Sequence, residues 1–175
     1  YGQKLAQYPI AAMESLTEVD GAGLSISSAD LTINVRRDSF EMMEAAHAYE
    51  DAIAAGKTKY EAVAASGNLI HSSYGAEFVS DRPRKGTTND LTISAIRLGD
   101  VAFATIRFET YIDFMHRLQA RSPFIQTFVI QLAGTEGGNY LATHRGADAK
   151  GYSASMFCNM VSADGGQQWV ENQLE

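Results

Sequence analysis

The sequence is poor in the residue types that define several protein classes. A single cysteine, Cys158, excludes an internal disulfide framework. No apolar run approaches the roughly 20 residues that a membrane-spanning helix needs. Basic residues number 14 against 21 acidic ones, and the resulting net charge of −7 argues against a nucleic-acid partner. What remains is the composition of a globular protein, 45% hydrophobic and 20% charged.

Short motifs that assign a function on their own are also missing. No HxH, HExxH or CxxC pattern occurs, and the four histidines are scattered along the chain. The glycine-rich stretch 133–143 lacks the spacing and the Lys-Ser/Thr pair of a P-loop. Any metal or phosphate chemistry must therefore be found in a larger constellation of residues.

The length of 175 residues suits one unit with a sizeable core, so we expect residues 1–175 to fold as a single domain or a large part of one. The chain begins with Tyr1 rather than an initiator Met, and no signal-peptide pattern follows. We therefore expect a piece of a longer protein.

Hydrophobic periodicity predicts an α+β fold, with helices packed on a mixed, largely antiparallel sheet. Apolar positions three or four apart predict helices within residues 1–20, after capping boxes at Asp38–Glu41 and Thr58–Glu61, from Thr110 to Ala120, and after Asp164. Strands are expected over 24–36, over 91–106, from Phe124 to Leu132 and from Tyr152 to Val161.

Two of these strands carry a sharper prediction. In segment 24–36, Leu24 and Ile26 occupy even positions, whereas Leu31 and Ile33 occupy odd ones. Such a change of parity predicts a β-bulge near Ser27-Ser28 or two consecutive strands. The run 124–132 is apolar on both faces, which predicts an interior strand covered on both sides.

The most informative stretch runs from Leu91 to Tyr152. Alternating apolar residues around Gly99-Asp100 predict a tight β-hairpin, because glycine reaches the positive φ that such turns need. Glu109 follows where the second strand meets the next helix. A carboxylate at this junction can bind or catalyse, or it can simply complement the dipole of the helix. Tyr140, near the end of the glycine-rich loop, can ligate a metal or donate to an oxyanion, or it can be a packing aromatic.

The pieces of this stretch follow one another in a distinctive order. The segment opens with Ile96-Arg-Leu-Gly-Asp100 and reaches Glu109 at the end of the next strand. After it come Arg121-Ser-Pro-Phe124, Ala133-Gly134, Tyr140-Leu-Ala-Thr143 and Gly151-Tyr152. This order resembles the neutral/alkaline (non-lysosomal) ceramidase family, most closely over residues 91–152 and more loosely over the whole chain. The resemblance implies that residues 1–175 are the C-terminal half of a larger α/β-type catalytic domain.

The resemblance also implies a zinc-dependent amide hydrolase whose substrate is a small-molecule or lipid amide. The family's ligand glutamate corresponds to Glu109, although Arg107-Phe108 replaces the usual Pro-Gly before it. For the ligand tyrosine three alternatives stand: Glu136 substitutes for it, Tyr140 serves through a shift of the loop, or the site is incomplete. Two zinc histidines and a nucleophilic serine would come from the missing N-terminal half. In such an enzyme a zinc-activated water attacks the amide carbonyl.

A non-catalytic module is the alternative from another class. In that case the fold serves for binding or structure, Glu109 only supports its helix, and the changes in the loop record a lost site. The 175 residues alone are not expected to be active, because a catalytic zinc normally takes three protein donors.

Overall fold

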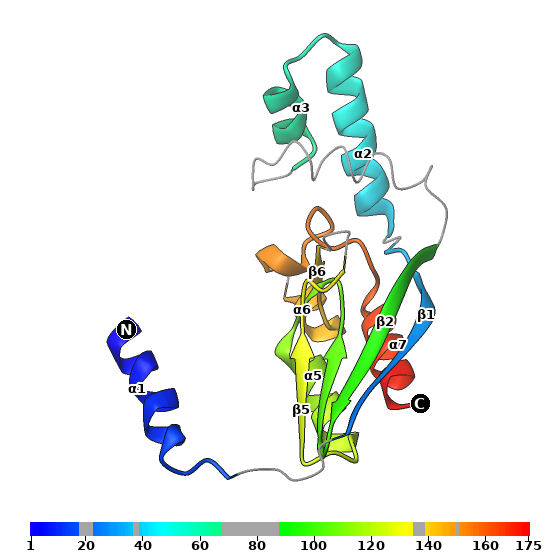
Figure 1. The fold of residues 1–175 in the computed structure, drawn as a ribbon. Coiled ribbons are helices and arrows are strands. Elements are labelled where there is room, and N and C mark those ends of the chain that lie inside the picture. Colours follow the sequence, from blue (N-terminus) through cyan, green and yellow to red (C-terminus); the bar gives the residue numbers. More distant parts are fainter. Residues whose placement is uncertain (18–22, 37–38, 68–87, 135–138, 150) are drawn as a thin grey trace.

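Figure 1 shows the fold of the protein in a computed structural model, which describes residues 1–17, 23–36, 39–67, 88–134, 139–149 and 151–175. The elements are α1 (Gly2–Met13), β1 (Leu24–Asn34), α2 (Ser39–Ala54), α3 (Lys59–Ala65), β2 (Thr88–Leu98), β3 (Val101–Thr105), β4 (Glu109–Thr110), α5 (Ile112–Arg121), β5 (Gln126–Ile130), β6 (Tyr140–Leu141), α6 (His144–Asp148), the 3₁₀ turn η2 (Tyr152–Ala154) and α7 (Ala163–Leu174). Helices and a mixed sheet confirm the α+β class.

The larger sheet has four strands in the order β1-β2-β3-β5. The first three are antiparallel, whereas β5 runs parallel to β3. Leu98 pairs with Val101, so Gly99-Asp100 form a two-residue turn with Gly99 at φ 59°. The predicted hairpin is thereby confirmed. β4 and β6 form a second sheet of two parallel strands.

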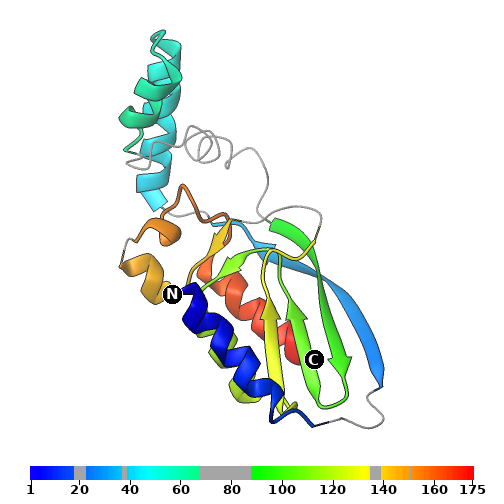
Figure 2. The ribbon, with the colours of Figure 1, turned by 60° about the vertical axis from the view of Figure 1, so that its left-hand side comes forward.

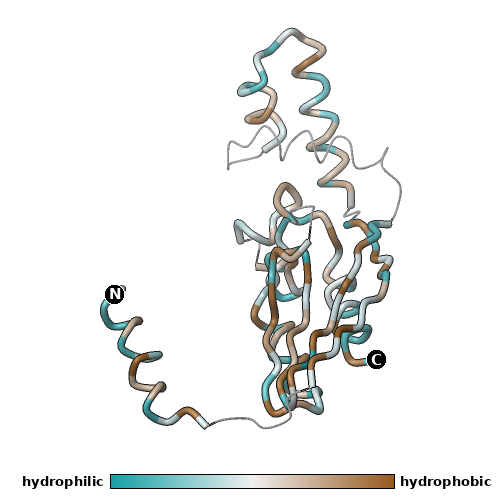
Figure 3. Tube along the Cα trace, in the orientation of Figure 1, coloured by the Kyte–Doolittle hydropathy of each residue, from teal (hydrophilic) through white to brown (hydrophobic). Residues whose placement is uncertain are grey.

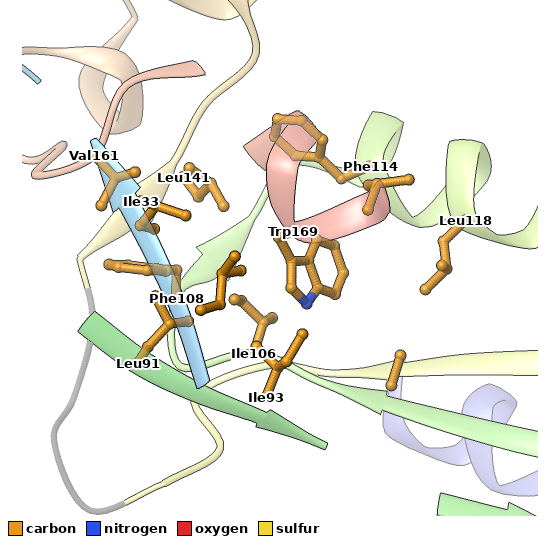
Figure 4. Close-up of a cluster of buried hydrophobic side chains, with 13 residues drawn as sticks. Ile33, Leu91, Ile93, Ile106, Phe108, Phe114, Leu118, Leu141, Val161 and Trp169 are labelled. Carbon is orange, nitrogen blue, oxygen red and sulfur yellow. The ribbon is translucent and has the colours of Figure 1, made fainter. Parts of the chain in front are cut away.

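One face of the four-stranded sheet, called here the core face, carries the main hydrophobic core. α7 packs against β1 and β2, and α5 packs against β5 and α7. Trp169 of α7 is fully buried, and its indole Nε1 donates to the carbonyl oxygen of Thr105 at 3.2 Å. Figure 4 shows the side chains gathered around it: Ile33, Leu91, Ile93, Ile106, Phe108, Phe114, Leu118, Leu141 and Val161. Each such burial contributes about 1.5–3 kcal/mol, so this cluster holds sheet and helices together.

β1 is one continuous strand, and the predicted bulge is wrong. Every residue from Leu24 to Asn34 pairs in register with β2. Leu31 and Ile33 lie in the core, whereas Leu24 and Ile26 are exposed on the opposite, outer face. Since side chains of a strand alternate between faces, the parity change marks a switch of apolar side chains from one face to the other.

β5 ends the row of described strands, so the prediction of an interior strand is also wrong. Among the described residues it pairs only with β3. Thr127 points to the core face and is buried, while Phe128 and Ile130 are 45% and 43% exposed. The ring of Phe128 stacks on that of Phe103, with centroids 5.3 Å apart. The apolar side chains of Phe128 and Ile130 therefore lie on the outer face of the sheet.

The segment predicted as a last strand, 152–161, is a 3₁₀ turn followed by isolated bridges at Asn159 and Val161. Its backbone pairs with a different segment at each step. The backbone N–H of Tyr140 donates to the Cys158 carbonyl, and the backbone N–H of Arg36 donates to the Met160 carbonyl. No single neighbouring strand can therefore build a ladder along it. The closing helix is confirmed, with Ser162 rather than Asp164 as its N-cap.

α2 and α3 form a helical hairpin that Figure 2 shows projecting from the sheet. The predicted capping box of Thr58 and Glu61 is confirmed. The apolar spacing in α2 predicts a buried stripe of Phe40, Met43, Ala46, Tyr49 and Ile53. Ala46 and Tyr49 are indeed buried, together with Met42 and Ala45, whereas Phe40, Met43 and Ile53 are exposed. The reason is tertiary, since Phe157 packs against the first half of this face and α3 against the second. Asp38, the predicted capping residue of α2, lies outside the described residues.

α1 confirms the predicted N-terminal helix but buries none of its residues, and it includes Pro9. Figure 3 shows brown, apolar positions interspersed with polar ones along it. Leu5, Tyr8 and Met13 are all about two-thirds exposed. Within the described part of the chain, no helix combines the length and the apolar character needed to cross a bilayer.

Replacing Gly166 with alanine should destabilise the fold, because the new Cβ would overlap the fully buried ring of Phe114. We expect the free energy of unfolding to fall by about 1–2 kcal/mol, since overpacking outweighs the gain in helix propensity. Urea denaturation measures the loss. Gly2→Ala is the control, because nothing lies within 4 Å of its added Cβ. Equal stability of both variants would contradict this packing.

Candidate functional site

The short sheet of β4 and β6 brings Glu109 and Tyr140 together. The two residues are paired in the parallel ladder. The backbone of Glu109 donates to the Asn139 carbonyl at 3.2 Å, and that of Tyr111 donates to the Leu141 carbonyl at 3.0 Å. Because paired residues project from the same face of a sheet, both side chains lie on one side. There the Glu109 carboxylate lies close enough to the Tyr140 hydroxyl to raise its pKa.

The opposite face of this small sheet is anchored in the main core. Phe108 and Leu141 are fully buried there, and Thr110, paired with Leu141, is 9% exposed. Alternation along each strand then directs the intervening Glu109 and Tyr140 away from the core. Apolar burial on one face thus fixes the position of two polar side chains on the other.

A second tyrosine borders the pair. Tyr152 of η2 meets Tyr140 edge to face, with ring centroids 5.7 Å apart. η2 is held in place partly by Ser153, whose hydroxyl lies 2.8 Å from that of Tyr111. In the sequence, Tyr152 belongs only to the Gly-Tyr element of the resemblance, and its distance along the chain from Glu109 and Tyr140 gives no reason to place it at the site. Its place is decided by the packing of η2 against β6.

The surroundings raise the pKa of Tyr140. Burial of the phenol is the largest cause, and the hydrogen bond to Glu109 with the charge of that carboxylate adds to it. Both effects disfavour the phenolate. In the metal-free protein Tyr140 therefore remains a protonated donor beyond the pH at which an ordinary tyrosine ionises.

The three residues predicted as metal ligands thus have different outcomes. The structure places Glu109 and Tyr140 side by side, while Glu136 lies outside the described residues. Glu109 belongs to a strand rather than to the start of a helix, since α5 begins after its N-cap Tyr111.

Among the described residues, no group of three or more His, Cys, Asp and Glu side chains could hold a metal ion. His144, for example, lies at the surface with its Nε2 2.8 Å from a carboxylate oxygen of Asp164. Glu109 and Tyr140 together offer two oxygen donors, which fit part of a zinc coordination sphere but fall short of the usual three protein ligands.

A polar cavity of about 530 Å³ lies on the outer face of the sheet, near the segments that lead to the pair. It is lined by Asp30, Thr32, Asp90, Leu91, Thr92, Arg107, Ala133 and Gly134. Each aspartate accepts a hydrogen bond from a threonine of the neighbouring strand, at 2.6 Å for Asp90 and 2.9 Å for Asp30. These hydrogen bonds between β1 and β2 hold both carboxylates against the outer face of the sheet.

No family model, curated protein or solved structure matches the chain. Any functional conclusion therefore rests on the resemblance in the sequence and on the geometry around Glu109 and Tyr140.

In metal-free protein we expect Tyr140 to ionise above the ordinary tyrosine pKa of about 10. Since the folded state keeps this proton longer than the unfolded chain, its contribution to stability is complete below that pH and is lost as the pH rises further. The difference in absorbance at 295 nm between wild type and Tyr140→Phe should show the late ionisation. Glu109→Gln should move it only part of the way back, because burial remains.

Proposed function

We propose that this chain is the C-terminal part of a zinc-dependent amide hydrolase of the neutral ceramidase type, with an N-acyl amide as substrate. One observation supports it most. Glu109 and Tyr140 come from separate segments that the resemblance connects with zinc, and they are paired across β4 and β6 with their side chains on one face. A family likeness without a site would not require that pairing.

In this proposal the Glu109 carboxylate and the Tyr140 phenol oxygen are two of the zinc ligands. The remaining donors, two histidines by the resemblance, come from residues outside these 175. Glu136, which lies outside the described residues, is the alternative to Tyr140 as the oxygen donor of the loop. A zinc ion held there supplies a Lewis acid for the amide carbonyl and for an attacking water. Burial of Phe108 and Leu141 on the reverse face holds both ligands in place.

The protonation state of the pair follows from its chemistry. A phenol that ligates a metal gives up its proton, and Glu109 must stay ionised to bind the same metal. The proton of Tyr140 would therefore be released to solvent when zinc binds. Metal affinity should therefore increase with pH, and zinc should lower the pKa that burial raises.

The non-catalytic module remains the second candidate, and one observation favours it. The ladder of β4 and β6 is held by the burial of Phe108 and Leu141 without any ligand. Glu109 and Tyr140 can then be simply the outward residues of a structural strand pair.

Zinc stoichiometry of the full-length protein separates these functions. Elemental analysis should find about one zinc per chain in wild type, and Glu109→Gln and Tyr140→Phe should lose or strongly weaken it, because each removes one of few donors. Glu171→Gln is the matched control. Glu171 is an exposed partner of Arg121 at 2.6 Å that joins α7 to α5, and its loss should leave zinc unchanged.

A well-folded wild type without zinc, or zinc retained equally by Glu109→Gln, would exclude the hydrolase and leave the module. Zinc lost from Glu171→Gln as well would show that the effect is unspecific.

A further inference from the structure

The outer face of the four-stranded sheet carries an apolar patch. One apolar residue from each strand joins a continuous row of ladder partners, which consists of Ile26, Ile96, Phe103 and Phe128. A second row beside it contains Leu24, Leu98 and Val101. All seven side chains are exposed or half-buried in the part of the chain that the structure describes. A contiguous apolar surface of this kind marks a place where another folded surface packs.

The patch lies on the same side of the chain as Glu109. From Val101 to Thr110 burial alternates without interruption, so that every even-numbered side chain is buried and every odd-numbered one is partly exposed. Phe103 belongs to this outward series, and Glu109 ends it. About 20 Å of extended chain separates the two, at about 3.3 Å per residue. One folded layer can therefore cover the patch and also reach the carboxylate.

The polar cavity of the outer face connects the patch with the pair of Glu109 and Tyr140. Arg107, the outward residue before Glu109, lines this cavity together with Ala133 and Gly134 of the glycine-rich stretch that leads to Tyr140. Tyr140 in turn is the ladder partner of Glu109. Both segments of the candidate site thus border the outer face, at the end of the sheet away from the patch.

The candidate metal site is incomplete within these residues. In the described ranges no group of three or more His, Cys, Asp and Glu side chains could hold a metal ion. A catalytic zinc normally takes three protein ligands, and Glu109 and Tyr140 supply two. In the proposed hydrolase the other donors belong to residues outside these 175. Whatever carries them must pack beside the pair, and the apolar patch is a surface on that side against which it can pack.

α1 could cover the patch but could not supply those donors. Its sequence, Gly2–Met13, contains no His, Cys, Asp or Glu, the usual zinc ligands. This holds equally for α1 of the same chain and for α1 of a second copy. In the structure α1 buries none of its residues and stands apart from the sheet (Figure 1). The patch and the unfilled metal site therefore point to one occupant that satisfies both.

We propose that the apolar patch is the docking surface for the part of the full-length protein that carries the remaining zinc donors. Burial of the patch brings those donors to Glu109 and Tyr140. The inference rests on the proposed hydrolase function and names the surface that completes its metal site. The docking part presents a predominantly apolar surface, because none of the seven patch residues is polar or charged and burying unpaired polar groups against them costs free energy.

Hydroxyl-radical footprinting of the full-length, metal-free protein tests the docking without reference to zinc. Phe128 of the patch should be oxidised at least about fivefold more slowly than Phe40 of α2, because the centre of an interface excludes water. In the described residues Phe128 is 45% and Phe40 74% exposed, so without a cover their rates would differ by less than about twofold.

Zinc affinity of the full-length protein, measured by chelator competition, tests the second half of the inference. Phe128→Asp should weaken zinc binding at least about tenfold although Phe128 offers the metal no donor, because a charge in the interface opposes docking and undocking removes ligands. Ile53→Asp is the matched control. Ile53 is 43% exposed on α2. Its variant should keep zinc affinity within about twofold, as substitutions at exposed positions remote from a site do.

Each other result contradicts a particular step. Oxidation of Phe128 as fast as that of Phe40 overturns the docking, and zinc in the wild type then leaves the hydrolase standing. Protection of Phe128 only at concentrations at which sedimentation shows a dimer assigns the patch to a second copy. Protection lost on removal of residues 1–17 assigns it to α1, and both results overturn the inference.

The zinc measurements separate the two proposals further. Normal zinc affinity in Phe128→Asp shows that the covering part does not carry the donors, which overturns the inference alone. Equal loss of zinc in Ile53→Asp does the same, because the effect is then unspecific. Absence of zinc from wild type excludes the hydrolase and this inference together.

Discussion

The pairing of β4 with β6 is the constraint on which the rest of the candidate site depends. Two residues of each strand suffice, because Phe108 and Leu141 anchor the reverse face in the same core that Trp169 organises. Two-stranded sheets are only marginally stable by themselves. This one is stable because the burial of apolar side chains fixes it. The polar face of the sheet is thus placed by forces that act on its other face.

That arrangement places Glu109 and Tyr140 on one face of the small sheet. Burial of the phenol and the neighbouring carboxylate together raise the pKa of Tyr140. Asn159 forms a bridge with Tyr140 and is buried, and within the described part of the chain its Nδ2 has no hydrogen-bond partner. Burial increases the free-energy cost of such an unpaired group.

Prediction succeeded where local chemistry decides the structure. Gly99-Asp100 form the expected turn and Thr58 caps its helix, because both depend on residues within four positions in the chain. It failed where a distant partner decides. The expected bulge in β1 is absent because β2 supplies a continuous ladder, and the buried face of α2 is set by Phe157 and α3.

The same division holds for the site. The sequence by itself determined the α+β class, the hairpin before Glu109 and the choice of Glu109 and Tyr140 as residues worth attention, since these follow from local pattern and motif order. Only the tertiary structure decided that the two residues are paired across β4 and β6, that Tyr152 borders Tyr140 and that Asn159 bridges it. Strand register and parallel pairing between segments far apart in the chain are set by burial in a shared core, and such burial leaves no local pattern in the sequence.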